Sequence, residues 1–423
     1  MLQVSYIREN REQVLDRLAV KNFKQPELVD EILQLDDTRR QTQVKLDNTS
    51  AEANSAAKQI GELMRTGKKD EAEAIKAKTG VWKEDIKKYN EELAAVEADL
   101  HQKLVLLPNL PHRSVPKGLT PEDNEVVLQN GAIPKLPADA LPHWELAAKY
   151  KLIDFELGVK ITGAGFPVYT GKGAKLQRAL INFFIDEAEK AGYKEVGVPL
   201  VVNEASGFGT GQLPDKEGQM YFVNEDNLYL IPTAEVPITN LYRDVILKTD
   251  ELPVKNCGHT PCFRREAGSY GAHVRGLNRL HQFDKVEIVQ IANPETSYDA
   301  LEQMSSHVQG LLQKLGLPYR VLRLCGGDMG FTSALTYDME TWSAAQQRWL
   351  EVSSVSNFET YQANRLKLRF RNAEGKTQLA HTLNGSALAL PRIVATLLEN
   401  NQTEKGIKIP EVLVPYIGFE WID

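Results

Sequence analysis

Apolar residues near the N-terminus recur at the spacing of a helical seam. Over residues 82–100 the steps are four and three, which keeps one helical face toward a partner helix. A weaker version of the pattern covers residues 32–63, and Thr66-Gly67-Lys68 offers a point of chain reversal. The pattern predicts an antiparallel pair of helices of roughly 35 to 40 residues each over residues 26–107. The expected seam residues are Ile32, Leu35, Thr42, Leu46, Thr49, Ala53, Ala56, Ile60, Leu63, Trp82, Ile86, Tyr89, Leu93, Val96 and Leu100.

The pattern changes after residue 107. Pro108, Pro111 and Pro116 interrupt helical periodicity, and short apolar runs then alternate with longer helical patterns such as residues 175–192. The strand-like runs are residues 194–202, 227–232, 285–291 and 320–324. We therefore expect a helical arm at 1–107, a linker at 108–135 and a mixed body of helices and strands at 136–423.

Composition limits the classes of function. A net charge of −7 over 423 residues provides no global positive field, so nucleic-acid binding would have to rest on local Lys and Arg. The predicted helical pair interleaves such residues with Asp and Glu, which fits either a solvated coiled coil or an arm that binds a nucleic-acid backbone. Three cysteines predict free thiols without a disulfide or zinc site. The charged N-terminus and the lack of a long apolar run predict a cytoplasmic protein without a membrane partner.

One charged stretch, residues 259–289, suggests chemistry. If it forms two strands joined through a loop at 268–280, Arg264 and Glu266 share one strand face, as do Phe283, Lys285 and Glu287 on the second strand. A guanidinium, carboxylates and an aromatic ring on one surface would suit a nucleotide beside an amino group. The alternative is a ladder of cross-strand ion pairs on a solvated face.

This stretch resembles motif 2 of the class II aminoacyl-tRNA synthetases, in the form found in the seryl-tRNA synthetases. Further resemblances follow in order along nearly the whole chain. "AGYKEVGVPLVV" is similar to motif 1, "NLYLIPTAEVPITN" to the serine-binding loop, and "EVSSVSNFETYQANRLKLRFR" to the strand that holds ATP and metal. "HTLNGSALALPRIVATLLENNQTEKGIKIPEVLVPYIG" is similar to motif 3, and the helical pair, "LPNLPH" and "PHWEL" also fit. The resemblance implies an α+β fold: a two-helix coiled coil, then a catalytic domain on an antiparallel sheet flanked by helices.

The resemblance also implies site residues. Arg264 would hold the α-phosphate and the substrate carboxylate, Glu266 would accept from the adenine amino group, and Phe283 would stack on adenine. Arg392 would cover the other adenine face or reach the γ-phosphate, with Arg279 assisting. The implied ATP-binding residues are Arg264, Arg265, Glu266, Arg279, Phe283, Glu351, Val352, Ser353, Ser354 and Arg392. The implied serine-binding residues are Thr233, Ala234, Glu235, Glu287, Asn384 and Ser386.

Arg264, Arg392 and Glu351 are the expected catalytic residues, and Glu351 with Ser354 would hold Mg²⁺. The implied partners are ATP, L-serine, tRNA(Ser), tRNA(Sec) where it exists, and a second copy of the chain joined through motif 1. The basic loop with His273, Arg275 and Arg279 would reach toward the tRNA acceptor end, and the helical arm would grip the tRNA.

The sequence departs from the family pattern at four positions. Val355 replaces a usual cysteine, and Asn364 replaces a usual arginine and receives no role. Ala387 and Pro391 stand where glycine is frequent, so the motif 3 helix should begin late, with Pro391 in its first turn. Two other functions remain open: a ligase that loads a carrier protein, whose relatives lack the coiled coil, and an inactive paralogue, which should have lost one of the two motif arginines.

Overall fold

The computed structural model describes residues 1–215, 218–266 and 274–423. The chain divides into two compact units, one formed by Met1–Ala19 and Phe23–Pro108, the other by Val20–Asn22 and Asn109–Asp423. The expected linker at 108–135 and the other expected domain limits stay predictions.

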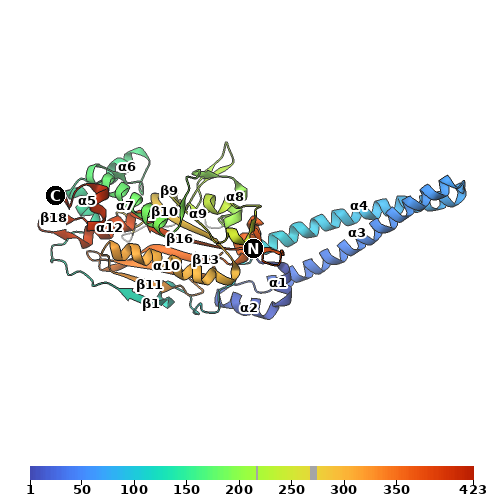
Figure 1. Cartoon of the computed structure of the whole chain (residues 1–423), viewed down its shortest axis with the longest axis horizontal. Helices are drawn as coiled ribbons and strands as arrows, with labels where there is room; N and C mark the ends of the chain where they lie inside the picture. The colour runs from blue at the N-terminus through green and yellow to red at the C-terminus, as the bar shows by residue number, and fades with distance from the viewer. Residues whose placement is uncertain (216–217, 267–273) are drawn as a thin grey trace. The chain divides into compact units, whose positions relative to one another are not determined.

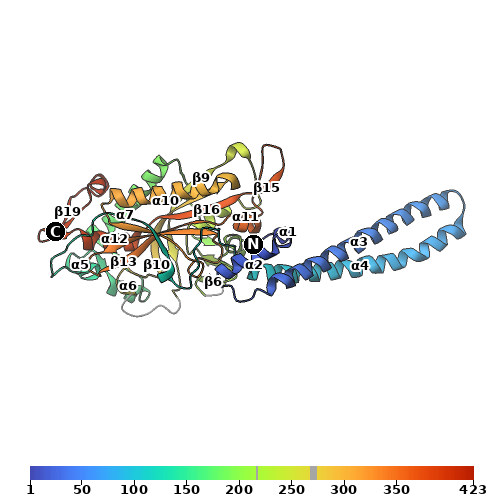
Figure 2. The same ribbon diagram turned by 90° about the horizontal axis from the view of Figure 1, so that it is seen from below.

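The first unit is helical. It contains α1 (Val4–Glu9), α2 (Arg11–Val20), α3 (Leu28–Arg65) and α4 (Lys69–Leu106). Helices α3 and α4, each of 38 residues, run side by side in opposite directions (Figure 2). Every expected seam residue is buried or half-buried, whereas most neighbouring positions are exposed. The predicted helical pair is therefore confirmed.

The reversal between α3 and α4 has a backbone cause. Gly67 adopts φ +77°, a conformation that glycine reaches without a Cβ clash. The Lys68 N–H then donates to the Leu63 carbonyl at 2.9 Å, which satisfies one of the free carbonyls at the end of α3. At the other end of α3, Arg8 contacts Asp36 at 2.6 Å and Arg11 contacts Asp30 at 2.7 Å.

The second unit is built on an eight-stranded sheet with the strand order β1-β11-β12-β13-β16-β10-β9-β4 (Figure 1). All neighbours in it are antiparallel except β4, which runs parallel to β9. The strands are β1 (Glu125–Asn130), β4 (Lys194–Glu195), β9 (Val254–Phe263), β10 (Gln282–Ala292), β11 (Tyr319–Arg323), β12 (Leu335–Ser343), β13 (Arg348–Asn357) and β16 (His381–Ala389). The predicted α+β class is confirmed.

Helices and smaller sheets surround this sheet. The helices are α5 (His143–Lys149), α6 (Phe155–Ile161), α7 (Gly171–Lys190), α8 (Glu204–Thr210), α9 (Glu235–Asn240), α10 (Ser297–Lys314), α11 (Thr360–Leu366), α12 (Leu390–Asn400) and α13 (Val414–Ile417). Short 3-10 turns lie at Pro121–Asp123, Thr249–Glu251, Pro294–Thr296 and Glu411–Leu413. The smaller sheets comprise β2 (Ile153–Asp154), β3 (Val168–Tyr169), β5 (Val201–Val202), β6 (Phe222–Val223), β7 (Leu228–Leu230), β8 (Ile246–Lys248), β14 (Arg369–Arg371), β15 (Thr377–Leu379), β17 (Gln402–Thr403), β18 (Gly406–Lys408) and β19 (Trp421–Ile422).

The two faces of the large sheet differ in chemistry. On β10, Val286 and Ile288 are fully buried in the main core together with apolar residues of α7, α10 and α12. Phe283, Lys285 and Glu287 alternate with them and point to the opposite face, as predicted for this strand. One face therefore holds the core, and the other presents polar side chains.

Two expectations about strands are wrong. Strand β9 ends at Phe263, and Glu266 has φ +49°, so Arg264 and Glu266 do not share a strand face. The run 194–202 forms the short strands β4 and β5 instead of one strand, with Pro199 between them, since proline cannot donate to a sheet ladder.

The motif 3 helix begins as expected. Helix α12 starts at Leu390 and holds Pro391 in its first turn, where the absent N–H costs no intrahelical hydrogen bond. In the part of the chain that the structure describes, no helix combines the length and apolar character needed for a membrane crossing.

Candidate active site

The polar face of the large sheet carries six of the expected site residues, namely Phe283, Glu287, Glu351, Ser354, Asn384 and Ser386. Register places Glu287 of β10 opposite Ser386 of β16, and Asn384 opposite Ser356 of β13. The turn before α9 adds Thr233 and Glu235. Residues from four separate stretches of sequence therefore line one surface.

The expected amino-acid pocket contains two buried carboxylates. The Thr233 hydroxyl donates to Glu287 Oε2 at 3.2 Å and accepts from the Glu235 backbone N–H at 3.3 Å. Burial, followed by the nearby charge of Glu287, raises the pKa of Glu235 from 4.5 to about 7, although Gln362 and Asn384 oppose the rise through hydrogen bonds. Such a carboxylate gains from the arrival of an ammonium group, which would supply the missing positive charge.

A buried lysine partly balances these acids. Lys285 Nζ lies 2.6 Å from Glu287 Oε2, and both side chains are almost fully buried. Glu287 therefore has a charged partner, whereas the hydrogen-bond partners of Glu235 are neutral groups. Ala234 serves packing, because its side chain belongs to a small apolar cluster with Ile238 and Val289.

A second layer fixes Glu235. Gln362 of α11 donates to Glu235 Oε1 at 2.7 Å and to the Thr210 carbonyl at 3.1 Å, while the Thr382 hydroxyl donates to the Gln362 amide oxygen at 2.7 Å. Gln362 is buried and belongs to the stretch that resembles the family's ATP and metal strand, but the resemblance assigned it no role.

Arg264 lies against the expected adenine platform. Its guanidinium carbon is 5.2 Å from the centre of the Phe283 ring, a cation–π distance, and its Nε donates to the Pro232 carbonyl at 3.3 Å. The structure thus brings Arg264, Phe283 and the turn before Thr233 together. Arg265 is exposed, and its backbone N–H donates to the Gln219 carbonyl.

Glu266 pairs with Arg279 at 2.9 Å. Both residues line a cavity of about 940 Å³ that is also bordered by Trp144, Phe155 and Arg275. The cavity adjoins the expected nucleotide site and includes none of the expected serine-binding residues. The proposed contribution of His273 to the basic loop lies outside the described residues.

Arg392 bridges two parts of the site. Its Nε donates to the Asn278 carbonyl at 3.1 Å, and one terminal nitrogen donates to the Glu351 carbonyl at 2.7 Å. The same guanidinium lies 3.7 Å from the Glu351 carboxylate. The structure therefore places Arg392 and Glu351 side by side, as a shared nucleotide site requires.

A β-bulge brings Glu351 and Ser354 to one face. Consecutive residues of β12, Met339 and Glu340, pair with Ser353 and Glu351, so Val352 is an extra residue in β13. Without the bulge, side chains three positions apart on a strand would point to opposite faces. Val352 packs in the core and the Ser353 hydroxyl donates to the Ser386 carbonyl at 2.6 Å, so only their backbone atoms could contact a nucleotide.

Asp338 joins Glu351 and Ser354 on this face, and the sequence reasoning missed it. It lies opposite Ser354 in the register, accepts a hydrogen bond from the Ser354 side chain, and has one buried oxygen without a hydrogen-bond partner among the described residues. Burial and the neighbouring Glu351 charge raise its pKa well above the usual value. In the sequence, the signal for Asp338 was the alternation of apolar and polar residues in "LTYDMETW", which assigns Asp338 to the polar face of a strand.

The acidic face fits a magnesium ion. Mg²⁺ favours one or two carboxylate or hydroxyl ligands and completes its shell with phosphate oxygens and water. Among described residues, no cluster of three or more His, Cys, Asp or Glu could hold a metal by itself. Glu351 and Ser354 therefore suit an ion that arrives with a phosphate group, and Asp338 beside them has a buried oxygen without a hydrogen-bond partner among the described residues.

Comparisons with known proteins agree along the whole chain. The profile of the "Seryl-tRNA synthetase N-terminal domain" matches residues 1–111, and that of the "tRNA synthetase class II core domain (G, H, P, S and T)" matches residues 221–401. The chain is 53% identical to the serine--tRNA ligase of Salinibacter ruber over 99% of its length and 98% of the relative's. It is 47% identical to the serine--tRNA ligase of Akkermansia muciniphila, over 100% of this chain and 99% of the relative.

Solved structures give the same result. The seryl-tRNA synthetase of Pyrococcus horikoshii, complexed with ATP, superposes with a TM-score of 0.94 at 33% identity, over 100% of this chain and 99% of that one. The cytoplasmic serine-tRNA ligase of Naegleria fowleri, in complex with AMP, gives a TM-score of 0.89 at 26% identity, with the same coverage.

Proposed function

The chain belongs to the seryl-tRNA synthetase family, and from that premise we propose that it joins L-serine to tRNA(Ser) in two steps through a seryl-adenylate. The observation that carries this proposal is the pocket of Thr233, Glu235 and Glu287, which suits a small amino acid with an ammonium group and a hydroxyl. It lies on the same sheet face as the residues proposed for ATP.

In the first proposed step, a serine carboxylate oxygen attacks the α-phosphorus of ATP and diphosphate leaves. No protein nucleophile is needed, so the chain's contribution is alignment and electrostatic stabilisation. Arg264 would hold the α-phosphate, and Arg392 would neutralise charge on the departing phosphates. Both guanidiniums are held by backbone carbonyls before substrate arrives, which reduces the cost of ordering them during the reaction.

Mg²⁺, when bound with ATP, would supply positive charge to the phosphate oxygens. We propose Glu351 and Ser354 as its ligands, because the bulge at Val352 directs both side chains to the polar face. The expectation of no zinc stays a prediction.

Serine selection follows from the proposed pocket. Alanine would leave buried hydrogen-bonding groups without partners, and threonine would have to fit an extra methyl group against a buried wall formed partly by Asn384 and Ser386. In the second proposed step, the terminal adenosine hydroxyl of the tRNA attacks the seryl-adenylate and AMP leaves.

The coiled coil of α3 and α4 is the proposed tRNA-binding arm. Its exposed lysines, including Lys83, Lys87 and Lys88, could contact phosphates without reading bases. Two of them form only long contacts with Glu91 and Glu92, at 3.9 Å, so these contacts cost little to exchange for phosphates. Charging of tRNA(Sec) and a cytoplasmic location stay predictions.

We also propose a homodimer through the motif 1 segment. Leu200 and Val201 in that segment are exposed, and so are Leu157, Val159 and Ile161 of α6. Such apolar side chains in water favour burial in an interface. Sedimentation velocity should show a species of about twice the chain mass of 47.4 kDa.

The deciding experiment is serine-dependent ATP–diphosphate exchange, run with serine, threonine, alanine and glycine, with and without tRNA. Exchange that requires serine and not tRNA supports the proposed first step. Exchange with another amino acid would favour a carrier-loading ligase, and no exchange would favour an inactive paralogue. The variant Arg264→Ala should lose exchange, and activity near that of the unmodified protein would refute the role of this arginine.

A further inference from the structure

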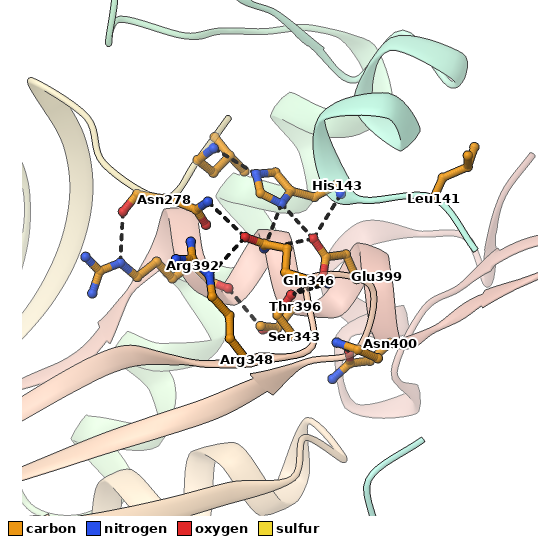
Figure 3. Close-up of polar contacts among 12 residues, drawn as sticks. Leu141, His143, Asn278, Ser343, Gln346, Arg348, Arg392, Thr396, Glu399 and Asn400 are labelled. Carbon is orange, nitrogen blue, oxygen red and sulfur yellow. Dashed lines mark hydrogen bonds and ion pairs between the residues drawn. The ribbon is translucent and has the colours of Figure 1, made fainter. Parts of the chain in front are cut away.

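A polar cluster with a fully buried centre lies beside the proposed nucleotide site, and Arg392 is the predicted site residue that it contains. Its centre is the pair His143 of α5 and Glu399 of α12, whose side chains are both 0% exposed (Figure 3). Buried charges persist when hydrogen bonds surround them, and such networks specify one arrangement of the groups they join.

The hydrogen bonds assign a role to each imidazole nitrogen. The Leu277 backbone N–H points at Nε2 from 2.8 Å, and because an N–H can only donate, Nε2 is the acceptor. Nδ1 then carries the proton and donates it to Glu399 Oε1 at 2.8 Å. That oxygen also accepts from the His143 backbone N–H at 3.0 Å and from Gln346 at 3.0 Å.

Glu399 is held as firmly as the histidine that it orients. Its second oxygen accepts from the Ser343 hydroxyl, so both carboxylate oxygens are engaged. Burial works against ionisation, but the hydrogen bonds from His143 and Ser343 outweigh it and leave the pKa of Glu399 below its usual value. An ionised Glu399 keeps the imidazole in one orientation.

The other side of the imidazole supports a turn that contains Arg279 and contacts Arg392. Leu277 donates to His143, the carbonyl of Asn278 accepts from Arg392 Nε at 3.1 Å, and Arg279 pairs with Glu266 at 2.9 Å. Residues 277, 278 and 279 thus contact His143, Arg392 and Glu266 in turn. Gln346 adds a second tether, because Asn278 Nδ2 donates to its amide oxygen at 3.0 Å.

The turn fits closely over the ring. Gly276 has φ +69°, and a Cβ at this position would come within 2.3 Å of His143 Nε2. The imidazole therefore sets the height of the turn through contact as well as through the hydrogen bond.

We propose that His143, oriented by Glu399, is a positioning residue that fixes the turn 277–279 and thereby holds Arg392 and Arg279 ready for a nucleoside triphosphate. The inference rests on the proposed function of these two arginines. Groups that are fixed before substrate arrives stabilise developing charge at lower cost than groups that must be ordered during the reaction. A merely structural pair would instead affect folding stability and leave nucleotide affinity unchanged.

Two substitutions separate these possibilities. In His143→Asn, the amide ends near the position of Nδ1, so it can still donate to Glu399 but leaves the Leu277 N–H without its acceptor. In His143→Gln, the longer side chain reaches the position of Nε2 and can still accept from Leu277, but it loses the Nδ1 donor. His143→Asn thus keeps the hydrogen bond to Glu399, and His143→Gln keeps the hydrogen bond from Leu277.

The measurements are the KM values for ATP and serine in ATP–diphosphate exchange, the Kd of ATP by calorimetry and the Tm. We expect His143→Asn to raise the KM and Kd of ATP about tenfold, the effect of one lost hydrogen bond, and His143→Gln to raise them about twofold. The KM of serine should stay unchanged in both. Equal ATP affinity in the two variants, or a larger loss in His143→Gln, would overturn the proposal.

The half-buried Gln346 provides a second test if either histidine variant fails to fold. Gln346→Ala removes the tether to Asn278 together with the hydrogen bond to Glu399, and should raise the Kd of ATP about threefold; an unchanged Kd would overturn the proposal. Calorimetry also distinguishes a failure of the proposed function from a failure of the role proposed for His143. If the unmodified protein binds ATP but shows no serine-dependent exchange, the proposed function fails, while the order of ATP affinities still decides the role of His143.

Discussion

The affinity for serine should depend on pH through Glu235. Burial and the adjacent Glu287 raise the pKa of Glu235 to about 7, so the free pocket titrates within the range in which the enzyme can be assayed. The serine ammonium group needs an ionised carboxylate. Protonation of Glu235 should therefore weaken serine binding as the pH falls.

The size of the effect follows from that pKa. At pH 6 about nine in ten molecules carry a protonated Glu235, and at pH 8 about one in ten do. If only the ionised form binds, the KM of serine falls about tenfold from pH 6 to pH 8. The charged groups that face Glu235 are Glu287 and Lys285, which form an ion pair with each other, and Gln362 and Asn384 are hydrogen-bonded to it.

The assay is ATP–diphosphate exchange at saturating ATP across pH 6 to 8, with the KM of ATP measured in parallel. Gln362→Leu is the matched variant, because it removes a hydrogen bond that lowers the pKa of Glu235, so its transition should move to higher pH. A serine KM that stays constant over this range would refute the reasoning. A KM that moved equally for ATP would place the titrating group elsewhere.

Three further results are expected. Glu351→Gln should raise the Mg²⁺ concentration for half-maximal exchange about tenfold or more by removing an anionic ligand, and an unchanged Mg²⁺ titration would contradict this. Lys285→Met should lower the free energy of unfolding by about 3 kcal/mol, because Glu287 keeps a buried charge without its 2.6 Å partner; urea denaturation measures it, and a decrease below about 1 kcal/mol would show that Glu287 finds another partner. Replacing Lys83, Lys87 and Lys88 by Glu should raise the KM of tRNA and should leave ATP–diphosphate exchange without tRNA the same. The slope of the logarithm of tRNA affinity against the logarithm of salt concentration should fall by about one for each phosphate that is no longer bound. An unaltered tRNA KM would exclude this face of α4 as a tRNA-binding surface.

The helical pair was predictable because its information is local. A periodic seam and a glycine at the reversal need no knowledge of distant contacts, and both helices match the expected lengths. The two faces of β10 were predictable for the same reason, since alternation on a strand assigns Val286 and Glu287 to opposite sides.

The site was only partly predictable. Motif resemblance placed Arg264, Arg392 and Glu351 on one surface, but alternation led to a wrong account of Glu266, because β9 ends before it and the backbone enters a left-handed conformation. Asp338 and Gln362 act through contacts made only after distant strands and helices assemble. A single sequence carries no signal for such long-range partners.

The bulge at Val352 has a consequence for how this chain can vary. The residue itself contributes an apolar side chain to the core, so Ile or Leu at that position should be compatible with the site. Deleting it would restore a regular strand in which Glu351 and Ser354 stand two positions apart, so alternation would still keep both side chains on the polar face. Glu351 and Ser354 therefore share a face because a spacing of three positions is combined with one extra residue, and an added residue between them, with this single bulge kept, would turn one of the two side chains toward the core.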